Sequence, residues 1–183
     1  MSDPQYSHAA RPEVAFMLAQ IGAHAAAKFA ERLDPLKFTP PQAGILGVIS
    51  RQNGLSQQAL ADLLGMFPSR LVLMLDELEQ TGLIERRPDN SDRRVYALHL
   101  TARGKKALQA IARVAHEHED ALCAALNASE RETLAQLLSR IADEQQLRPG
   151  VHPGYRRLRC AQRFRIEQAE TSNQQRKGRS YEP

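Results

Sequence analysis

The sequence has little of what extracellular and membrane proteins need. Only two of its 183 residues are cysteines, Cys123 and Cys160, so a disulfide framework is excluded. It has no run of 18 uncharged apolar residues that could cross a bilayer. The first 16 residues contain Asp3 and Glu13 and no continuous apolar block, unlike a secretory signal. These features predict a cytoplasmic protein without a membrane partner.

The sequence is also poor in aromatic residues and in catalytic motifs. Aromatic residues make up 5% of the chain and tryptophan is absent, which argues against stacking on single-stranded DNA or RNA. There is no glycine-rich phosphate loop, no Gly-x-Ser-x-Gly and no His-Glu-x-x-His. We therefore expect neither an enzyme nor a bound cofactor. The hydrophobic content of 42% is nevertheless enough for a real core.

The net charge of +4 hides a strong segregation of charge along the chain. Residues 1 to 148 are nearly neutral, with 17 basic and 18 acidic side chains, whereas residues 149 to 183 carry eight basic and three acidic ones. Within the neutral part, residues 82 to 106 hold seven basic and three acidic side chains. This local excess of positive charge is suited to binding phosphate groups.

Two helices are expected before residue 55. Residues 13 to 34 carry apolar side chains three and four residues apart, which predicts a helix of about 20 residues with one apolar face. Thr39, the prolines after it and Gln42 predict a capping box at the start of a short second helix.

Residues 56 to 82 have the spacing of a helix-turn-helix. Ser56 is expected to cap the first helix and Gly65 to end it, after which Pro68 begins a second helix that ends at Gly82. Residues 83 to 100 then predict a β-hairpin with turn-forming residues at its tip. Helix-turn-helix and hairpin together predict a winged helix.

In the second strand of this hairpin, Tyr96, Leu98 and Leu100 alternate with other residues. Because side chains in a strand point alternately to opposite faces, we expect these three to lie on the helical core.

Residues 101 to 148 predict two further helices. The first has a heptad-like apolar seam that includes His118, and Ser129 with Glu132 is expected to form a capping box for the second. These apolar faces need a partner, which residues 13 to 34 could supply in a second subunit. Residues 149 to 183 are basic and rich in glutamine, and we expect them to be disordered.

Four segments of the sequence resemble the MarR family of bacterial transcriptional regulators. They are Thr39 to Gln42, Leu55 to Ala61, Leu78 to Arg87, and Asp92 to Thr101 with Gly104. The resemblance covers residues 13 to 148, and its most specific part is the ordered series of motifs from Gly82 to Gly104.

The resemblance implies a mainly helical, homodimeric fold with a small β-hairpin. A flexible N-terminus (1 to 12) would precede dimerisation helices at 13 to 34 and 101 to 148, a helix-turn-helix at 56 to 82 and a wing at 83 to 100. Two such winged helices would bind one pseudo-palindromic DNA duplex, usually as a repressor that responds to a small ligand.

The implied contacts to double-stranded DNA come from the helix-turn-helix and the wing. Arg94 would enter the minor groove, where negative potential is enhanced, and Asp92 is close enough in sequence to orient its guanidinium group. Arg86, Arg93 and Lys105 are expected to contact phosphates. The remaining candidates lie on the two helices of the motif, and they are Ser56, Gln57, Ser69 and Arg70.

The recognition helix departs from the family pattern at Val72 and Leu73, where polar residues are frequent. These side chains cannot form hydrogen bonds with bases, so direct readout is expected to fall mainly on Ser69 and Arg70. Leu73 would either contact thymine methyl groups or pack inside the protein.

The input signal is open at this stage. His116, Asp120 and Cys123 share one helical face and could bind zinc, although a packed histidine and a buried cysteine are the simpler interpretation. No cysteine lies in the N-terminal helix, which disfavours redox sensing. By resemblance, a small aromatic or phenolic acid is expected, and an apolar lining is offered by Met17, Ile21, His24, Phe38 and Ile45. The competing function is a dimeric winged-helix adapter that binds proteins instead of DNA.

Overall fold

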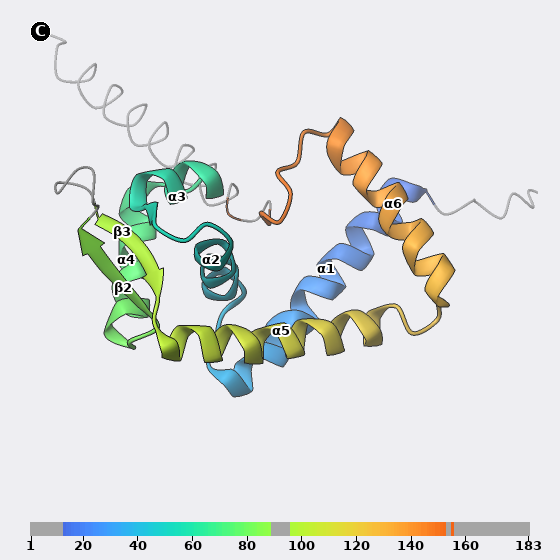
Figure 1. The fold of residues 1–183 in the computed structure, drawn as a ribbon. Helices are drawn as coiled ribbons and strands as arrows, with labels where there is room; N and C mark the ends of the chain where they lie inside the picture. The colour runs from blue at the N-terminus through green and yellow to red at the C-terminus, as the bar shows by residue number, and fades with distance from the viewer. Residues whose placement is uncertain (1–12, 89–95, 153–154, 156–183) are drawn as a thin grey trace, which may run out of the picture.

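The computed structural model describes residues 13–88, 96–152 and 155, and its elements run from the helix α1 to the helix α6 (Figure 1). The helices are α1 (Val14–Leu33), the 3-10 helix η1 (Asp34–Leu36), α2 (Pro40–Arg51), α3 (Gln57–Leu64), α4 (Pro68–Gln80), α5 (Ala102–Leu122) and α6 (Ala128–Glu144). The strands are β1 (Leu55–Ser56), β2 (Ile84–Pro88) and β3 (Tyr96–Leu100). The expectation of a mainly helical winged-helix fold is confirmed.

The helix α2 lies at the centre of the core, enclosed by the other elements of the winged helix (Figure 1). It begins at the predicted capping box, in which Thr39 and Gln42 each bond the backbone of the other. Five of its twelve residues are buried, and Ile45, Leu46 and Ile49 are fully inaccessible. Burying a large aliphatic side chain contributes roughly 1.5–3 kcal/mol, so this helix anchors the unit.

The helices α3 and α4 form the predicted helix-turn-helix. The hydroxyl of Ser56 accepts a bond from the Ala59 amide, and Gly65 ends α3 with a left-handed φ of 64°. Pro68 then opens α4, and the two helices meet at an angle of 116°. Among the described residues, no single helix is long and apolar enough to span a membrane; only α3 and α4, taken together as a bent pair, have the length and composition to do so.

The sheet contains one strand that the sequence did not reveal. β2 and β3 form the expected antiparallel hairpin, and the two-residue β1 pairs with the other edge of β3, giving the order β1-β3-β2. Leu98 and Leu100 lie on the core, but Tyr96 is 54% exposed, so its predicted inward position is wrong. Tyr96 pairs with Pro88 at the end of the hairpin farthest from Leu100.

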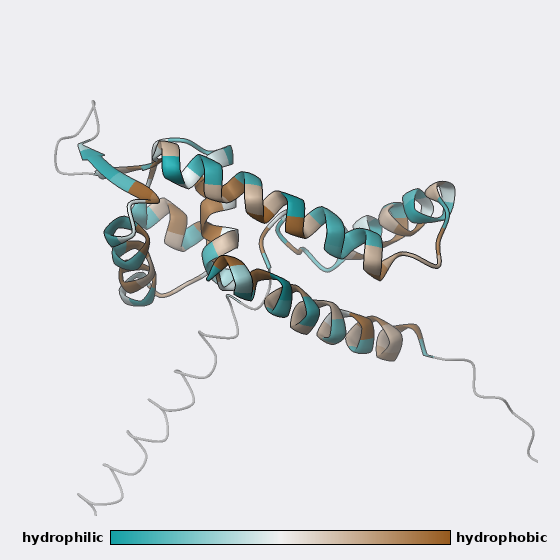
Figure 2. Ribbon diagram, turned by 90° about the horizontal axis from the view of Figure 1, so that it is seen from below, coloured by the Kyte–Doolittle hydropathy of each residue, from teal (hydrophilic) through white to brown (hydrophobic). Residues whose placement is uncertain are grey.

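The helices α1 and α5 run beside each other and extend away from the winged helix, with α6 at their far end (Figure 1). Ribbon colouring by hydropathy shows apolar segments recurring along α1 and α5 (Figure 2). The expected capping box at Ser129 and Glu132 is wrong: Asn127 and Glu130 form it two residues earlier. Asparagine caps a helix as well as serine does, and the chain leaves its turn at Asn127.

Candidate DNA-binding interface

The outer face of α4 is the first candidate surface. Leu71, Leu75 and Leu78 point into the core and are at most 1% exposed. The opposite face is therefore set by helical periodicity, and its exposed side chains include Ser69, Arg70, Leu73 and Glu77. Leu73 is 65% exposed, which decides against packing inside the protomer.

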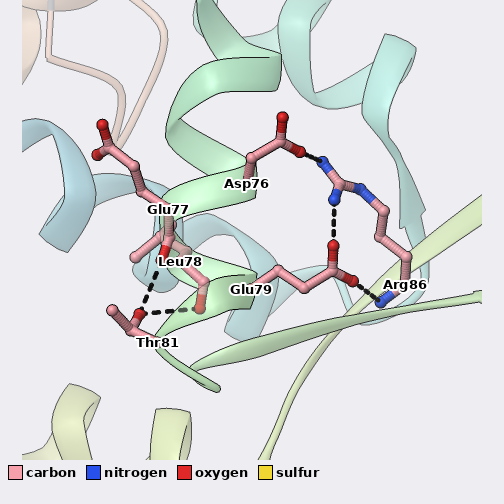
Figure 3. A network of polar contacts seen from close by, with 6 residues as sticks. All are labelled: Asp76, Glu77, Leu78, Glu79, Thr81 and Arg86. Carbon is pink, nitrogen blue, oxygen red and sulfur yellow. Dashed lines mark hydrogen bonds and ion pairs between the residues drawn. The ribbon is translucent and has the colours of Figure 1, made fainter.

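Two carboxylates hold Arg86 against α4 (Figure 3). Its Nη2 lies 2.6 Å from Asp76 Oδ1, its Nη1 is paired with Glu79, and its amide donates to Glu79 Oε1 at 3.2 Å. Burial alone would lower the pKa of Arg86, but the hydrogen bonds and charges of Asp76 and Glu79 outweigh it and raise the pKa. This charge-assisted network ties the first strand of the wing to the recognition helix.

The position of Arg86 differs from the expected phosphate contact. Its side chain is only 20% exposed, and both terminal nitrogens already have carboxylate partners. The sequence contained a signal for this role, because Asp76 and Glu79 are three residues apart on one helical face. The end of the same helix is fixed by the Thr81 hydroxyl, which donates to the carbonyls of Glu77 and Leu78 (Figure 3).

The wing candidates Asp92, Arg93 and Arg94 lie outside the described residues. The strands that carry the wing are described up to the Pro88–Tyr96 pair, so both ends of the connecting segment are fixed. Their predicted contacts to DNA stay predictions.

Lys105 is exposed on the first turn of α5. With Arg87 and His99 it lines a hollow of about 280 Å³ at the base of the wing. Arg87 is paired with Glu85 at 2.5 Å, and the Nδ1 of His99 lies 2.9 Å from the Asn53 side-chain oxygen. Lys105 is therefore the basic group here that is available for a phosphate.

Ser56 and Gln57 occupy the entry to α3. The Ser56 hydroxyl is engaged as a helix cap, at 3.1 Å from the Ala59 amide nitrogen, and Gln57 is half-buried. Because a capping oxygen is already occupied, Ser56 has a structural role beside any contact with DNA.

A cavity of about 510 Å³ lies between α1, α2, α4 and α5. Its lining combines apolar groups such as Phe29 and Ile111 with the basic side chains of Arg51 and Arg70. Three residues of the C-terminal segment complete its lining, and they are Gly150, His152 and Tyr155. Arg70 therefore borders both this cavity and the outer face of α4.

The residues predicted to line a ligand pocket are not brought together. Ile45 is fully buried in the core and Phe38 is half-buried, whereas Met17, Ile21 and His24 are exposed on α1. The cavity is lined by other residues than these five. Their contact with a ligand stays a prediction, because the apolar periodicity of α1 does not by itself show which of its faces meets α2.

The three candidate zinc ligands do not form a site either. In the described part of the chain, no group of three histidine, cysteine or acidic side chains is placed to hold a metal ion. Asp120 bonds Arg131 at 2.8 Å, which together with the nearby His116 lowers the pKa of Asp120. Cys123 is half-buried at the end of α5.

The second candidate surface is apolar and lies on the far helices. In the single chain, α6 has no buried residue although its sequence is strongly amphipathic. The large exposed apolar side chains on α1 and α6 are Val14, Phe16, Met17, Leu18, Ile21, Leu134, Leu137, Leu138 and Ile141. A face of this extent is typical of an interface between subunits.

Comparisons with known proteins agree with this architecture. The model of the MarR family matches residues 38–96. A Thauera aromatica protein, named for transcriptional regulation of the hcr operon, is 40% identical over 103 residues, covering 56% of this chain and 62% of that protein. The transcriptional regulator HosA of Escherichia coli O127:H6 is 30% identical over 104 residues, covering 57% of this chain and 77% of HosA. The chain belongs to the MarR family.

One solved structure extends the similarity to nearly the whole length of another protein. The transcriptional repressor CouR, bound to a 23-mer DNA duplex, aligns with a TM-score of 0.65 and 30% identity. The alignment covers 77% of this chain and 99% of CouR.

Proposed function

We propose that this protein is a homodimeric, sequence-specific repressor that binds double-stranded DNA in the cytoplasm and has no catalytic activity. The observation that carries the proposal is the outer face of α4, which presents Ser69, Arg70 and Leu73 beside a basic wing. An exposed recognition helix of this kind fits the major groove. The DNA complex of the similar repressor CouR supports the same docking.

The apolar face of α1 and α6 supports the homodimer. Two winged helices related by a two-fold axis would read half-sites about 10 bp apart, one turn of the duplex. The cavity beside Arg70 supports a ligand-responsive repressor, since its apolar walls and two arginines suit a small aromatic or phenolic acid.

The test is the salt dependence of binding to genomic fragments selected by the purified protein. A dimer that neutralises six to ten phosphates releases their counterions, so affinity should fall by about 10³–10⁵-fold between 50 and 200 mM salt. Fluorescence anisotropy with a labelled fragment measures this slope, and sedimentation equilibrium measures the dimer. A monomer, or an affinity for DNA that ignores salt, would favour the adapter function instead.

A second prediction separates base reading from phosphate contact on α4. Arg70→Ala should lower the ratio of operator to random-sequence affinity by about tenfold or more, because a good arginine–guanine pair is worth roughly 1–3 kcal/mol and the dimer makes it twice. Leu73→Ala should weaken only sites with thymine at the contacted position.

The measurement compares each variant on the selected operator and on a scrambled duplex of the same length. Arg113→Ala is the matched control, since Arg113 is an exposed arginine on α5, outside the helix-turn-helix and wing. Equal losses on both duplexes for Arg70→Ala would assign Arg70 to the phosphate backbone.

A further inference from the structure

The chain turns back after α6 and returns to the winged helix (Figure 1). Gln146 adopts a left-handed φ of 53°, and the Leu147 amide donates to the Ala142 carbonyl at 2.9 Å. The sequence alone predicts that order ends near residue 148. The following residues instead contact α2 and α3, which lie about a hundred positions earlier in the chain.

Arg148 makes the first of these contacts. Its Nη1 donates to the backbone carbonyls of Asp62 at 2.6 Å and Leu63 at 2.9 Å. These carbonyls belong to the last turn of α3, where unpaired acceptors and the helix dipole favour a cation. The contact therefore fixes the segment to the helix that leads into the recognition helix.

Tyr155 makes the deepest contact. Its side chain is 5% exposed and joins the core, and its hydroxyl donates to the Pro41 carbonyl at 2.8 Å. Burial raises the pKa of this phenol to about 12. The ring occupies the space left by Gly44 on α2, where an added Cβ would lie 2.0 Å from the hydroxyl oxygen.

These contacts connect α6 to the winged helix. On α6, the Arg131 side chain bonds Leu126 and Asp120 near the end of α5. The returning segment, in contrast, contacts α2 and α3 and lines the cavity beside Arg70. The segment therefore links α6 to α2, to α3 and to the cavity that Arg70 of the recognition helix lines.

We propose that residues 147–152 together with Tyr155 form a latch, which docks on α2 and α3 and holds the winged helix in one orientation relative to the dimerisation helices. The effect on DNA rests on the proposed function. A dimer must place two recognition helices in successive major grooves. A docked latch restricts the motion of these helices before binding, so less conformational freedom is lost when the dimer binds DNA. Release of the latch should weaken operator binding.

The most direct variant is Gly44→Ala, because the added methyl group fills the space that the Tyr155 hydroxyl occupies and no residue of the latch is changed. Alanine is otherwise favoured over glycine inside a helix, so the change does not weaken α2 itself. Gly47→Ala on the same helix is the matched control: its Cβ would meet only the flexible end of Arg51, at 3.4 Å from Nη1, whereas Arg51 contacts Gly150 of the latch through Nη2 at 3.5 Å. Arg148→Gln releases the other end of the latch and leaves the core unchanged.

Hydrogen exchange measured by mass spectrometry on the full chain reports docking directly. We expect the peptide around Val151 and Tyr155 to exchange at least tenfold faster in Gly44→Ala and in Arg148→Gln than in the parent or Gly47→Ala. Unchanged exchange in both latch variants would overturn the docked latch.

Operator affinity tests the coupling. We expect both latch variants to bind about three- to tenfold more weakly than Gly47→Ala, and an equal or higher affinity would overturn the coupling. If the parent protein binds no duplex, the proposed function fails, while the exchange experiment still decides whether the latch is docked.

Discussion

Arg94→Ala should weaken binding to every DNA duplex by about 100-fold, with little change in sequence preference. An arginine in a narrow minor groove reads shape and potential more than base identity, so its removal should affect operator and random duplexes alike. The homodimer has two such arginines, and a cost of about 1.4 kcal/mol at each corresponds to roughly tenfold per site.

The structure supports this expectation through the base of the wing. The segment that carries Arg94 starts and ends at the paired residues Pro88 and Tyr96, and the Arg86 network holds the strand β2 on α4. The base of the wing is therefore tied to α4 through Arg86, which favours a fixed starting position for the segment that carries Arg94.

Anisotropy titrations on the operator and on a scrambled duplex measure the effect. Arg93→Ala controls for the removal of one positive charge in the same segment. It should cost less affinity and reduce the salt slope by about one for each phosphate that is no longer neutralised. If Arg93→Ala and Arg94→Ala had the same small effect, the assignment of Arg94 to the minor groove would be wrong.

The sequence predicted those elements whose signals are local. The capping box of Thr39 and Gln42, the left-handed Gly65 and the helix-opening Pro68 each act within a few residues, and each has the predicted place in the structure. These positions set the start of α2, the end of α3 and the start of α4, which place the helix-turn-helix in the chain. The two-residue β1 could not be found, since it exists only through pairing with β3.

The features that the sequence missed depend on contacts between distant residues. Tyr155 is an isolated aromatic residue in a polar segment, and only the gap above Gly44 and the Pro41 carbonyl give it a place in the core. Arg86 is one of several arginines in a basic stretch, and its partners Asp76 and Glu79 decide that it holds the wing. The sequence placed Tyr155 in a disordered tail and Arg86 on a phosphate, whereas burial and pairing give both a structural role.

The second large effect is expected at Gly104, where alanine should destabilise the protein by about 3 kcal/mol. In an unconstrained helix this change would stabilise by roughly 0.5–1 kcal/mol, so the expected effect is opposite in sign. Gly104 is buried in the first turn of α5, and an added Cβ would lie 1.9 Å from the backbone oxygen of Leu83.

The oxygen of Leu83 cannot simply move away. It accepts bonds from the Thr101 amide at 3.1 Å and from the Thr101 hydroxyl at 3.3 Å. The same hydroxyl donates to Gly82 at 2.6 Å and caps α5 through the Gly104 amide. Displacing Leu83 would therefore loosen the start of β2, the cap of α5 and the junction between the wing and α5 together.

Thermal unfolding measures this prediction. For a domain of this size, 1 kcal/mol shifts the midpoint by about 2–4 °C, so Gly104→Ala should lower it by roughly 6–12 °C. Gly47→Ala, a glycine-to-alanine change in α2 with space for the Cβ, should leave it unchanged or raise it slightly. If both variants unfolded at the parent temperature, α5 would have room to shift at its first turn. The close approach of α5 to Leu83 would then not fix the wing relative to the long helices.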